Sequence, residues 1–194
     1  MTNKTIIVIT GATGTGKTTV QKYLRDEYGI PAVITHTTRP MRVGERNGVD
    51  YYFETPESFP KNHYLEHVKY AHFQYGSSHE GLNHAWAAHD VASIVLDTAG
   101  ALTYVHELGE QVAVLFLTVD NHASLRQRLL RRGDAESMVT KRLASPEYGR
   151  DLVLPIGLRG IAKTVVNDDW RLAKRQVDAF VKGLLADKSE KMSF

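Results

Sequence analysis

The fold and the first binding site of this chain are decided by residues 6–20, which read IIVITGATGTGKTTV. The β-branched run at its start is typical of a buried strand, and the pattern after the loop is typical of a helix. Gly11, Gly16, Lys17 and Thr18 have the spacing G-x-x-x-x-G-K-[ST] of a phosphate-binding loop. Glycines let such a loop curl its N–H groups toward phosphate oxygens, and the next helix adds partial positive charge. We therefore predict a nucleoside triphosphate site, with Lys17 on the β- and γ-phosphates and the Thr18 hydroxyl on Mg²⁺.

The composition is that of an ordinary soluble globular protein. The 194 residues suffice for one domain with its own core, and the net charge of +2 gives no general reason to expect nucleic acid as a partner. The chain has no cysteine, which excludes disulfides and thiolate zinc sites. No apolar run approaches the roughly 20 residues that span a bilayer, and no signal-peptide pattern is visible. We expect a cytoplasmic monomer or homodimer that binds neither membranes nor nucleic acids.

Strands and helices alternate around the loop. Residues 18–28 carry apolar side chains at the spacing of one helix face, Gly29 is placed as a C-cap, and 31–34 read as a second short strand. This βαβ pattern predicts a parallel sheet with the nucleotide at the carboxyl ends of its strands. Residues 91–97 read as another buried strand that ends in Asp97, an acid placed to hold Mg²⁺ directly or through water.

A polar stretch at residues 35–53 is rich in arginine and hydroxyl side chains. Arg39, Arg42 and Arg46 lie close together in sequence, in a loop with the turn-forming residues Gly44, Asn47 and Gly48. Guanidinium groups pair bidentately with phosphate oxygens, so the stretch can bind a second phosphate. A solvated loop with arginine as solubilising charge is the alternative.

Two motifs in order carry a resemblance to a known family. GATGTGKTT at 11–19 and TTRPMRVGERNGVDYYF at 37–53 together resemble guanylate kinases, the GMP-phosphorylating branch of the nucleoside monophosphate kinases. The family pattern of a Glu followed nine residues later by Tyr-Gly-Ser is met by Glu66 and residues 75–77. The chemistry is consistent, because one carboxylate can accept from both N1–H and N2–H₂ of guanine, whereas adenine lacks this donor pair.

The resemblance implies an α/β P-loop three-layer fold with a parallel sheet, a small GMP-binding insertion and a mobile lid. It divides a single domain into a core (1–34, 91–132 and 161–186), an insertion (about 35–90), a lid (about 133–160) and a tail (187–194). ATP is the implied phosphoryl donor, Mg²⁺ the metal, and GMP or dGMP the acceptor. The implied catalytic residues are Lys17, Arg39, Arg132 and Arg142.

The same resemblance assigns the binding residues. Those for ATP are Gly11, Ala12, Thr13, Gly14, Thr15, Gly16, Lys17, Thr18, Thr19, Asn167 and Asp168. Those for the acceptor are Thr35, Arg39, Arg42, Tyr51, Glu66, Tyr75 and Ser77. Those for the metal are Thr18 and Asp97.

The chain departs from the family pattern at several points. Ala99 stands where a second acid usually follows the third strand, and two prolines in 145–158 forbid the long helix that normally follows the lid. Two alternatives therefore stay open: a related kinase acting on another phosphorylated acceptor such as a ribose bisphosphate, and a non-catalytic guanylate-kinase-like binding module. Retention of Glu66 and Ser77 argues against the first, and the intact phosphate loop argues against the second.

Overall fold

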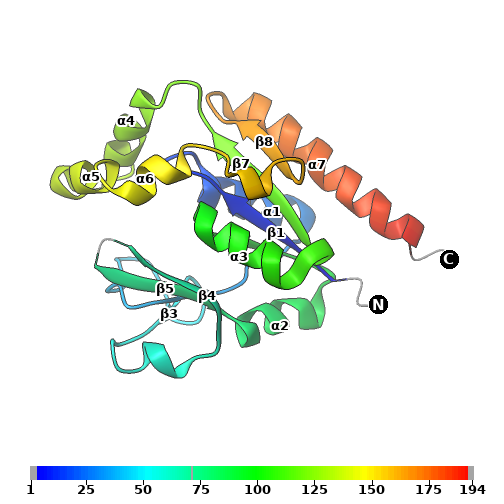
Figure 1. Ribbon diagram of the computed structural model, residues 1–194, viewed down its shortest axis with the longest axis horizontal. Helices are drawn as coiled ribbons and strands as arrows, with labels where there is room; N and C mark the ends of the chain where they lie inside the picture. The colour runs from blue at the N-terminus through cyan, green and yellow to red at the C-terminus, as the bar shows by residue number, and fades with distance from the viewer. Residues whose placement is uncertain (1–3, 71, 192–194) are drawn as a thin grey trace.

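The computed structural model describes residues 4–70 and 72–191 and contains two four-stranded sheets (Figure 1). The main sheet has the strand order β6-β1-β7-β8, and all of its pairings are parallel. The carboxyl ends of these strands therefore meet at one edge, where β1 runs into the phosphate loop. The strands are β1 (Thr5–Thr10), β6 (Val91–Val95), β7 (Val112–Thr118) and β8 (Ala162–Val166).

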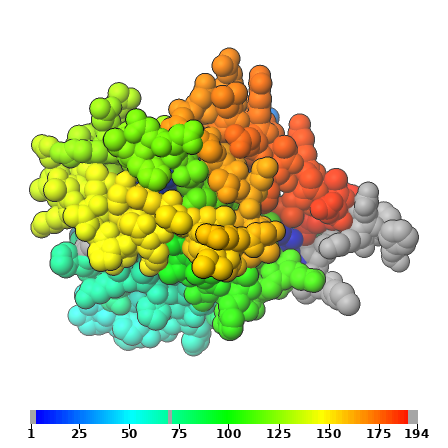
Figure 2. All heavy atoms as spheres, turned by 45° about the horizontal axis from the view of Figure 1, so that its top comes forward, coloured from blue at the N-terminus to red at the C-terminus, as the bar shows by residue number. Residues whose placement is uncertain are grey.

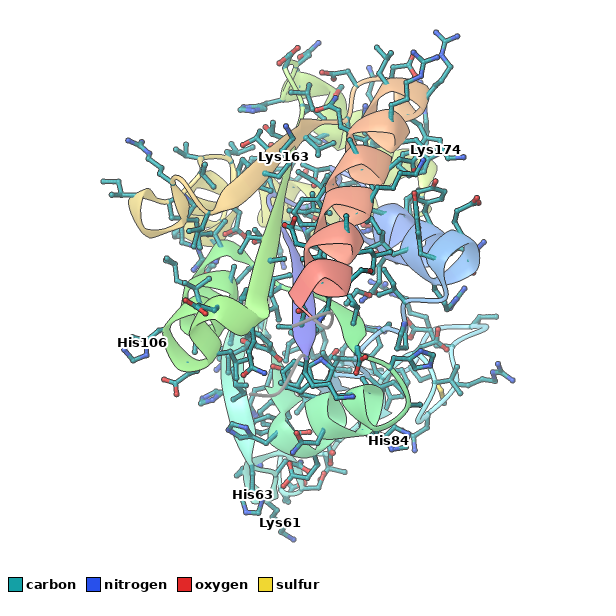
Figure 3. The ribbon with its side chains drawn as sticks, turned by 90° about the vertical axis from the view of Figure 1, so that its right-hand side faces the viewer. Lys61, His63, His84, His106, Lys163 and Lys174 are labelled. Carbon is teal, nitrogen blue, oxygen red and sulfur yellow. The ribbon has the colours of Figure 1, made fainter. Side chains whose placement is uncertain are left out.

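Helices cover both faces of the main sheet. Ile7 and Ile9 of β1 pack with α1 (Lys17–Tyr28) and α7 (Trp170–Lys191), whereas Ile6 and Val8 pack with α2 (His79–Ala88) and α3 (Thr98–Leu108). Successive side chains of a strand point to opposite faces, so a strand buried on both sides reads as a continuous apolar run. Figure 3 shows α1 and α3 on opposite sides of the strands, with Lys174 marking α7 on the α1 side. The predicted three-layer α/β fold with a parallel sheet is thus confirmed.

The second sheet lies beside the core and has the order β3-β2-β5-β4. Residues 64–78, whose alternating pattern is typical of a hairpin or a pair of short strands, form the antiparallel pair β4 and β5. In this pair Glu66 lies opposite Ser77. The elements are β2 (His36–Thr37), β3 (Tyr52–Phe53), the 3₁₀ turn η1 (Phe59–Lys61), β4 (Tyr64–Tyr70) and β5 (Phe73–Ser78).

The chain between β7 and β8 forms an arm of short helices. Ser145 accepts a hydrogen bond from Tyr148 N at 3.2 Å and Pro146 occupies the first turn of α6, so a new helix starts where a continuous one is broken, as predicted. In the space-filling view this arm and the second sheet form neighbouring lobes (Figure 2). Its elements are α4 (Ala123–Arg131), α5 (Glu136–Leu143), α6 (Pro146–Asp151) and η3 (Ile156–Leu158), and η2 (Gly109–Gln111) precedes β7.

The strand predicted at 31–34 is wrong. Ala32 makes only an isolated bridge with Ser93, supported by hydrogen bonds from Ser93 N to Pro31 O and from Val33 N to Ser93 O, each 2.8 Å long. The chain then leaves the main sheet, because His36 already pairs with β5 of the second sheet. The segment therefore follows β6 for too short a distance to become a strand.

The C-terminal helix α7 extends into the segment predicted to be a tail. The polar residues 187–191 continue α7 to Lys191, in keeping with the high helix propensity of lysine and glutamate, while 192–194 of the predicted tail lie outside the described residues. None of the helices in the described part of the chain is long and apolar enough to cross a membrane.

Candidate active site

The phosphate loop has the backbone that its glycines allow. Gly11, Gly14 and Gly16 all have positive φ, at 124°, 85° and 101°. A Cβ on Gly11 would lie 2.1 Å from the Leu117 carbonyl oxygen, and one on Gly16 would lie 2.4 Å from Asn167 Nδ2. The loop is therefore pressed against the ends of β7 and β8, and these two positions admit only glycine.

Lys17 curls back over the loop that precedes it. Its ammonium group donates to Gly11 O at 2.5 Å and to Ala12 O at 2.9 Å. Burial lowers the pKa of Lys17 to about 8, a shift that Asp151 and Asp97 oppose. A lysine held in this way can exchange its two carbonyl partners for phosphate oxygens, which would restore its full charge.

The residues predicted to hold Mg²⁺ lie on either side of Lys17. Thr18 and its neighbour Thr19 are exposed on the first turn of α1, where a hydroxyl can face a phosphate-bound ion. Asp97 follows β6 and caps α3, because Gly100 N donates to its Oδ1 at 2.7 Å. Its Oδ2 accepts from Arg150 Nη2 at 2.6 Å. Thr18 therefore fits direct ligation, and Asp97 fits a role through water while Arg150 stays paired.

The Arg39 guanidinium forms an ion pair with an acid of the same loop. Its buried guanidinium makes a bidentate pair with Glu45, at 3.0 and 2.8 Å, and lies 5.3 Å from the centre of the Tyr51 ring. Arg42 donates its backbone N–H to the same Glu45 at 2.8 Å and has an exposed side chain. Thr35, Arg42 and Tyr51 line one cleft. Arg39 and Arg42, predicted to bind the acceptor phosphate, thus share Glu45, an acid that the sequence analysis did not single out, and Tyr51 lies against Arg39.

Glu66 is a buried acid in the second sheet. The Ser77 hydroxyl donates to Glu66 Oε1 at 3.2 Å and accepts from Tyr104 Oη at 2.9 Å. Burial, together with the nearby Asp97 carboxylate, raises the pKa of Glu66 to about 7. The neighbouring Tyr75 ring lies edge-on to Tyr51 with 6.5 Å between ring centres, which links this acid to the arginine group. Since no cationic side chain in the described part of the chain pairs with Glu66, its carboxylate is available to accept from two adjacent N–H donors of a ligand.

The two arginines of the arm share one acid. Arg132 and Arg142 both pair with Asp134, the latter at 3.5 Å. Their charges also help to lower the pKa of Lys17, and Arg132 lines the same cleft as the phosphate loop. Sequence reasoning did not find Asp134 as their shared counter-ion, although an acidic residue between two lid arginines is a visible signal.

Asn167 and Asp168, predicted to contact ATP, follow β8. The Asn167 amide donates to Thr15 O at 2.7 Å and so clamps the phosphate loop, while Asp168 Oδ2 accepts from Asp120 N at 2.8 Å. Arg128 donates to Asn167 O at 2.8 Å. Asn167 therefore fixes the phosphate loop, and both Asn167 and Asp168 line the cleft.

A cleft of about 1040 Å³ runs along the phosphate loop, α1, Arg42 and Tyr51 of the second predicted site, and the corner after β8. Seven cationic side chains and only three acids line it, so it suits a ligand with several phosphates. Six of the predicted site residues do not line this cleft: Arg39, Glu66, Tyr75, Ser77, Asp97 and Arg142. The cations are Lys17, Lys22, Arg25, Arg42, Arg128, Arg131 and Arg132, and the acids are Glu45, Asp50 and Asp168.

Known proteins are similar to this chain in sequence and in fold. Residues 3–148 match the family described as Guanylate kinase. The guanylate kinase of Neisseria gonorrhoeae is 31% identical, and the match covers 97% of this chain and 92% of that protein. The guanylate kinase of Lactiplantibacillus plantarum is 29% identical, with coverage of 91% and 86%.

A solved structure agrees in fold. The crystal structure of guanylate kinase from Anaplasma phagocytophilum superimposes with a TM-score of 0.66 at 21% identity, and the match covers 97% of this chain and 88% of that one. The family match over most of the length, together with the phosphate loop and its surroundings, shows that this chain belongs to the guanylate kinase family.

Proposed function

We propose that this protein transfers the γ-phosphoryl group of ATP to GMP, and to dGMP, giving ADP and the guanosine diphosphate. The observation that carries the proposal is the buried Glu66, whose carboxylate accepts a hydrogen bond from Ser77. Burying a carboxylate without water or a cation costs free energy of folding unless a ligand supplies hydrogen-bond donors to it. The edge of guanine supplies two adjacent N–H donors.

Two different groups of residues bind the two nucleotides. The phosphate loop and Lys17 bind the donor phosphates, and Arg39, Arg42 and Tyr51 bind the acceptor phosphate. When guanine binds, its N–H groups would donate to the Glu66 carboxylate in place of Ser77. The Ser77 hydroxyl would then donate to guanine O6 instead. Thr35 and Tyr75 complete the acceptor pocket.

Phosphoryl transfer needs alignment and neutralisation of charge rather than covalent help. Arg132 and Arg142 would release Asp134 and bind the oxygens of the transferring group, while the arm closes over the cleft and excludes water. Mg²⁺, held by Thr18 and reached by Asp97 through water, would supply further neutralisation of the donor phosphates. Asn167 and Asp168 would border the adenine of ATP.

We further propose that the enzyme acts in the cytoplasm, without nucleic acid as a partner, as a monomer or homodimer. The cysteine-free composition suits a reducing compartment, and the cleft has the volume and charge for two small nucleotides. Size-exclusion chromatography with light scattering tests the assembly, and a tetramer would contradict it.

The test of the reaction is transfer of labelled γ-phosphate from ATP to GMP and dGMP, run beside Lys17→Met and Lys22→Met. We expect labelled diphosphate product from the wild type. The Lys22 variant loses one of seven cations of the cleft and should keep most of the rate, because its lysine lies on the exposed side of α1. Lys17→Met should lower the rate by at least a hundredfold. Binding of ATP and GMP without any transfer would instead favour the binding-module alternative.

A further inference from the structure

The short helix α6 brings a second ion-pair system to the carboxyl edge of the main sheet. Arg150 Nη2 donates to Asp97 Oδ2 at 2.6 Å, and Arg150 Nε donates to Asp151 Oδ1 at 3.0 Å. One guanidinium therefore bridges two acids that come from different elements, since Asp97 caps α3 and Asp151 ends α6.

Both acids are fixed by further partners. Asp97 Oδ1 accepts from Gly100 N at 2.7 Å, and Asp151 Oδ1 accepts from the Thr98 hydroxyl at 2.6 Å and from Thr98 N at 3.2 Å. Asp151 is only 5% exposed. Neither carboxylate can turn away to water without breaking the start of α3, so their negative charges stay where they are.

These charges lie at the same edge of the sheet as the lysine of the phosphate loop. Val95 of β6 is the last residue paired with β1, opposite Ile9, and both Asp97 and Gly11, whose carbonyl accepts from Lys17, follow that pair by two residues. Helix α6 reaches the same point, because Tyr148 packs in a cluster with Ala12. Asp151 and Asp97 both favour the charged form of Lys17, while Arg132 and Arg142 disfavour it.

Lys17 nevertheless pairs with neither acid and keeps its two loop carbonyls. The two carboxylates and Arg150 together carry one net negative charge. Without Arg150 they would carry two, next to a lysine that is already within their electrostatic reach. Lys17 would then exchange weak carbonyl partners for a strong ion pair.

We propose that Arg150 is a positioning residue for Lys17: by engaging Asp97 and Asp151, it keeps the phosphate-loop lysine available for the phosphates of the donor nucleotide. The inference rests on the proposed function only in taking ATP as the donor. Arg150 acts through the two acids and does not need to touch a substrate.

The experiment measures ATP binding by calorimetry in excess EDTA, so that neither metal nor acceptor takes part. We expect Arg150→Met to bind ATP about tenfold more weakly than the wild type, which corresponds to about 1.4 kcal/mol. Arg150→Lys keeps the charge and should stay within threefold. Arg159→Met is the matched control, because Arg159 is an exposed arginine on the same segment, and should bind as the wild type does.

A second substitution separates positioning from structural damage. In the Arg150→Met background, Asp97→Asn returns the local charge to its original value, and ATP affinity in EDTA should recover to within threefold of the wild type. A packing defect left by the loss of the guanidinium would not be repaired by neutralising Asp97, and repulsion between the two acids that loosens the fold would show as a lower unfolding temperature of Arg150→Met. Should the methionine variant not fold, Arg150→Gln, which keeps hydrogen bonds but loses the charge, is expected to show the same tenfold loss.

Unchanged ATP affinity in a folded neutral variant would overturn the inference, as would a loss that Asp97→Asn leaves in place. Either result would leave the proposed reaction standing. Conversely, a wild type that binds ATP but does not phosphorylate GMP would overturn the proposed reaction and leave this binding result intact.

Discussion

Replacement of Glu66 by glutamine should make the protein more stable and less able to bind GMP. The pKa of Glu66 is raised from 4.5 to about 7, mainly by burial and then by Asp97. At about 1.36 kcal/mol per pKa unit, ionisation of this carboxylate costs the folded state up to about 3 kcal/mol above pH 7. Its neutral form stabilises the fold below pH 4.5, and that contribution is lost as the pH rises through 7.

Glutamine does not ionise, so Glu66→Gln avoids this cost. We expect the variant to match the wild type in thermal unfolding at pH 5 and to unfold up to about 10 °C higher at pH 8, at about 2–4 °C per kcal/mol for a chain of this size. Glu110→Gln, on an exposed turn after α3, is the control and should change neither value.

The same substitution removes an acceptor from the guanine site. A hydrogen bond to a charged group contributes about 1.5–3 kcal/mol, and the glutamine amide would also turn an N–H toward a guanine donor. GMP affinity at pH 8 should fall roughly a hundredfold, while ATP affinity stays unchanged. Wild-type GMP affinity should itself weaken as the pH falls through 7. A variant that binds GMP normally, or that loses stability equally at both pH values, would refute this reasoning.

Three other outcomes follow from the site. Burial lowers the pKa of Lys17 to about 8, so ATP affinity measured by calorimetry should fall as the pH rises above 8; a flat profile up to pH 9.5 would contradict this. Tyr104→Phe removes the donor to Ser77 and should weaken GMP binding about fivefold, at about 1 kcal/mol for one hydrogen bond, with normal ATP binding. Gly11→Ala would place a Cβ 2.1 Å from Leu117 O and should abolish ATP binding, whereas Gly149→Ala, with open space around it, should not. An ATP-binding Gly11→Ala protein would show that the loop is not pressed against β7.

The features that the sequence predicts best are those written in contiguous residues. The strand, glycine loop and helix of residues 6–28 are specified locally, because β-branched residues, positive-φ glycines and one apolar helix face follow one another. The hairpin at 64–78 is similar, since its alternation fixes the register that sets Glu66 opposite Ser77.

The features that it missed depend on distant elements. Tyr104 reaches Ser77 from another layer of the fold, and Arg150 reaches Asp97 across 53 positions of the chain. Nothing local distinguishes that arginine from its solvated neighbours. The strand predicted at 31–34 failed for a related reason: its composition fits a strand, but the chain is drawn into the second sheet at His36.

The central claim is that a single buried acid selects guanine for phosphorylation. It is tested most directly by the ratio of kcat/KM for GMP to that for AMP, measured with ATP and Mg²⁺ for the wild type and for Glu66→Gln. The account predicts a ratio above about a thousand for the wild type, since unmet polar groups reject an analogue by such factors, and a fall of at least tenfold in the variant. Comparable rates with both acceptors, or a ratio that Glu66→Gln leaves unchanged, would contradict it.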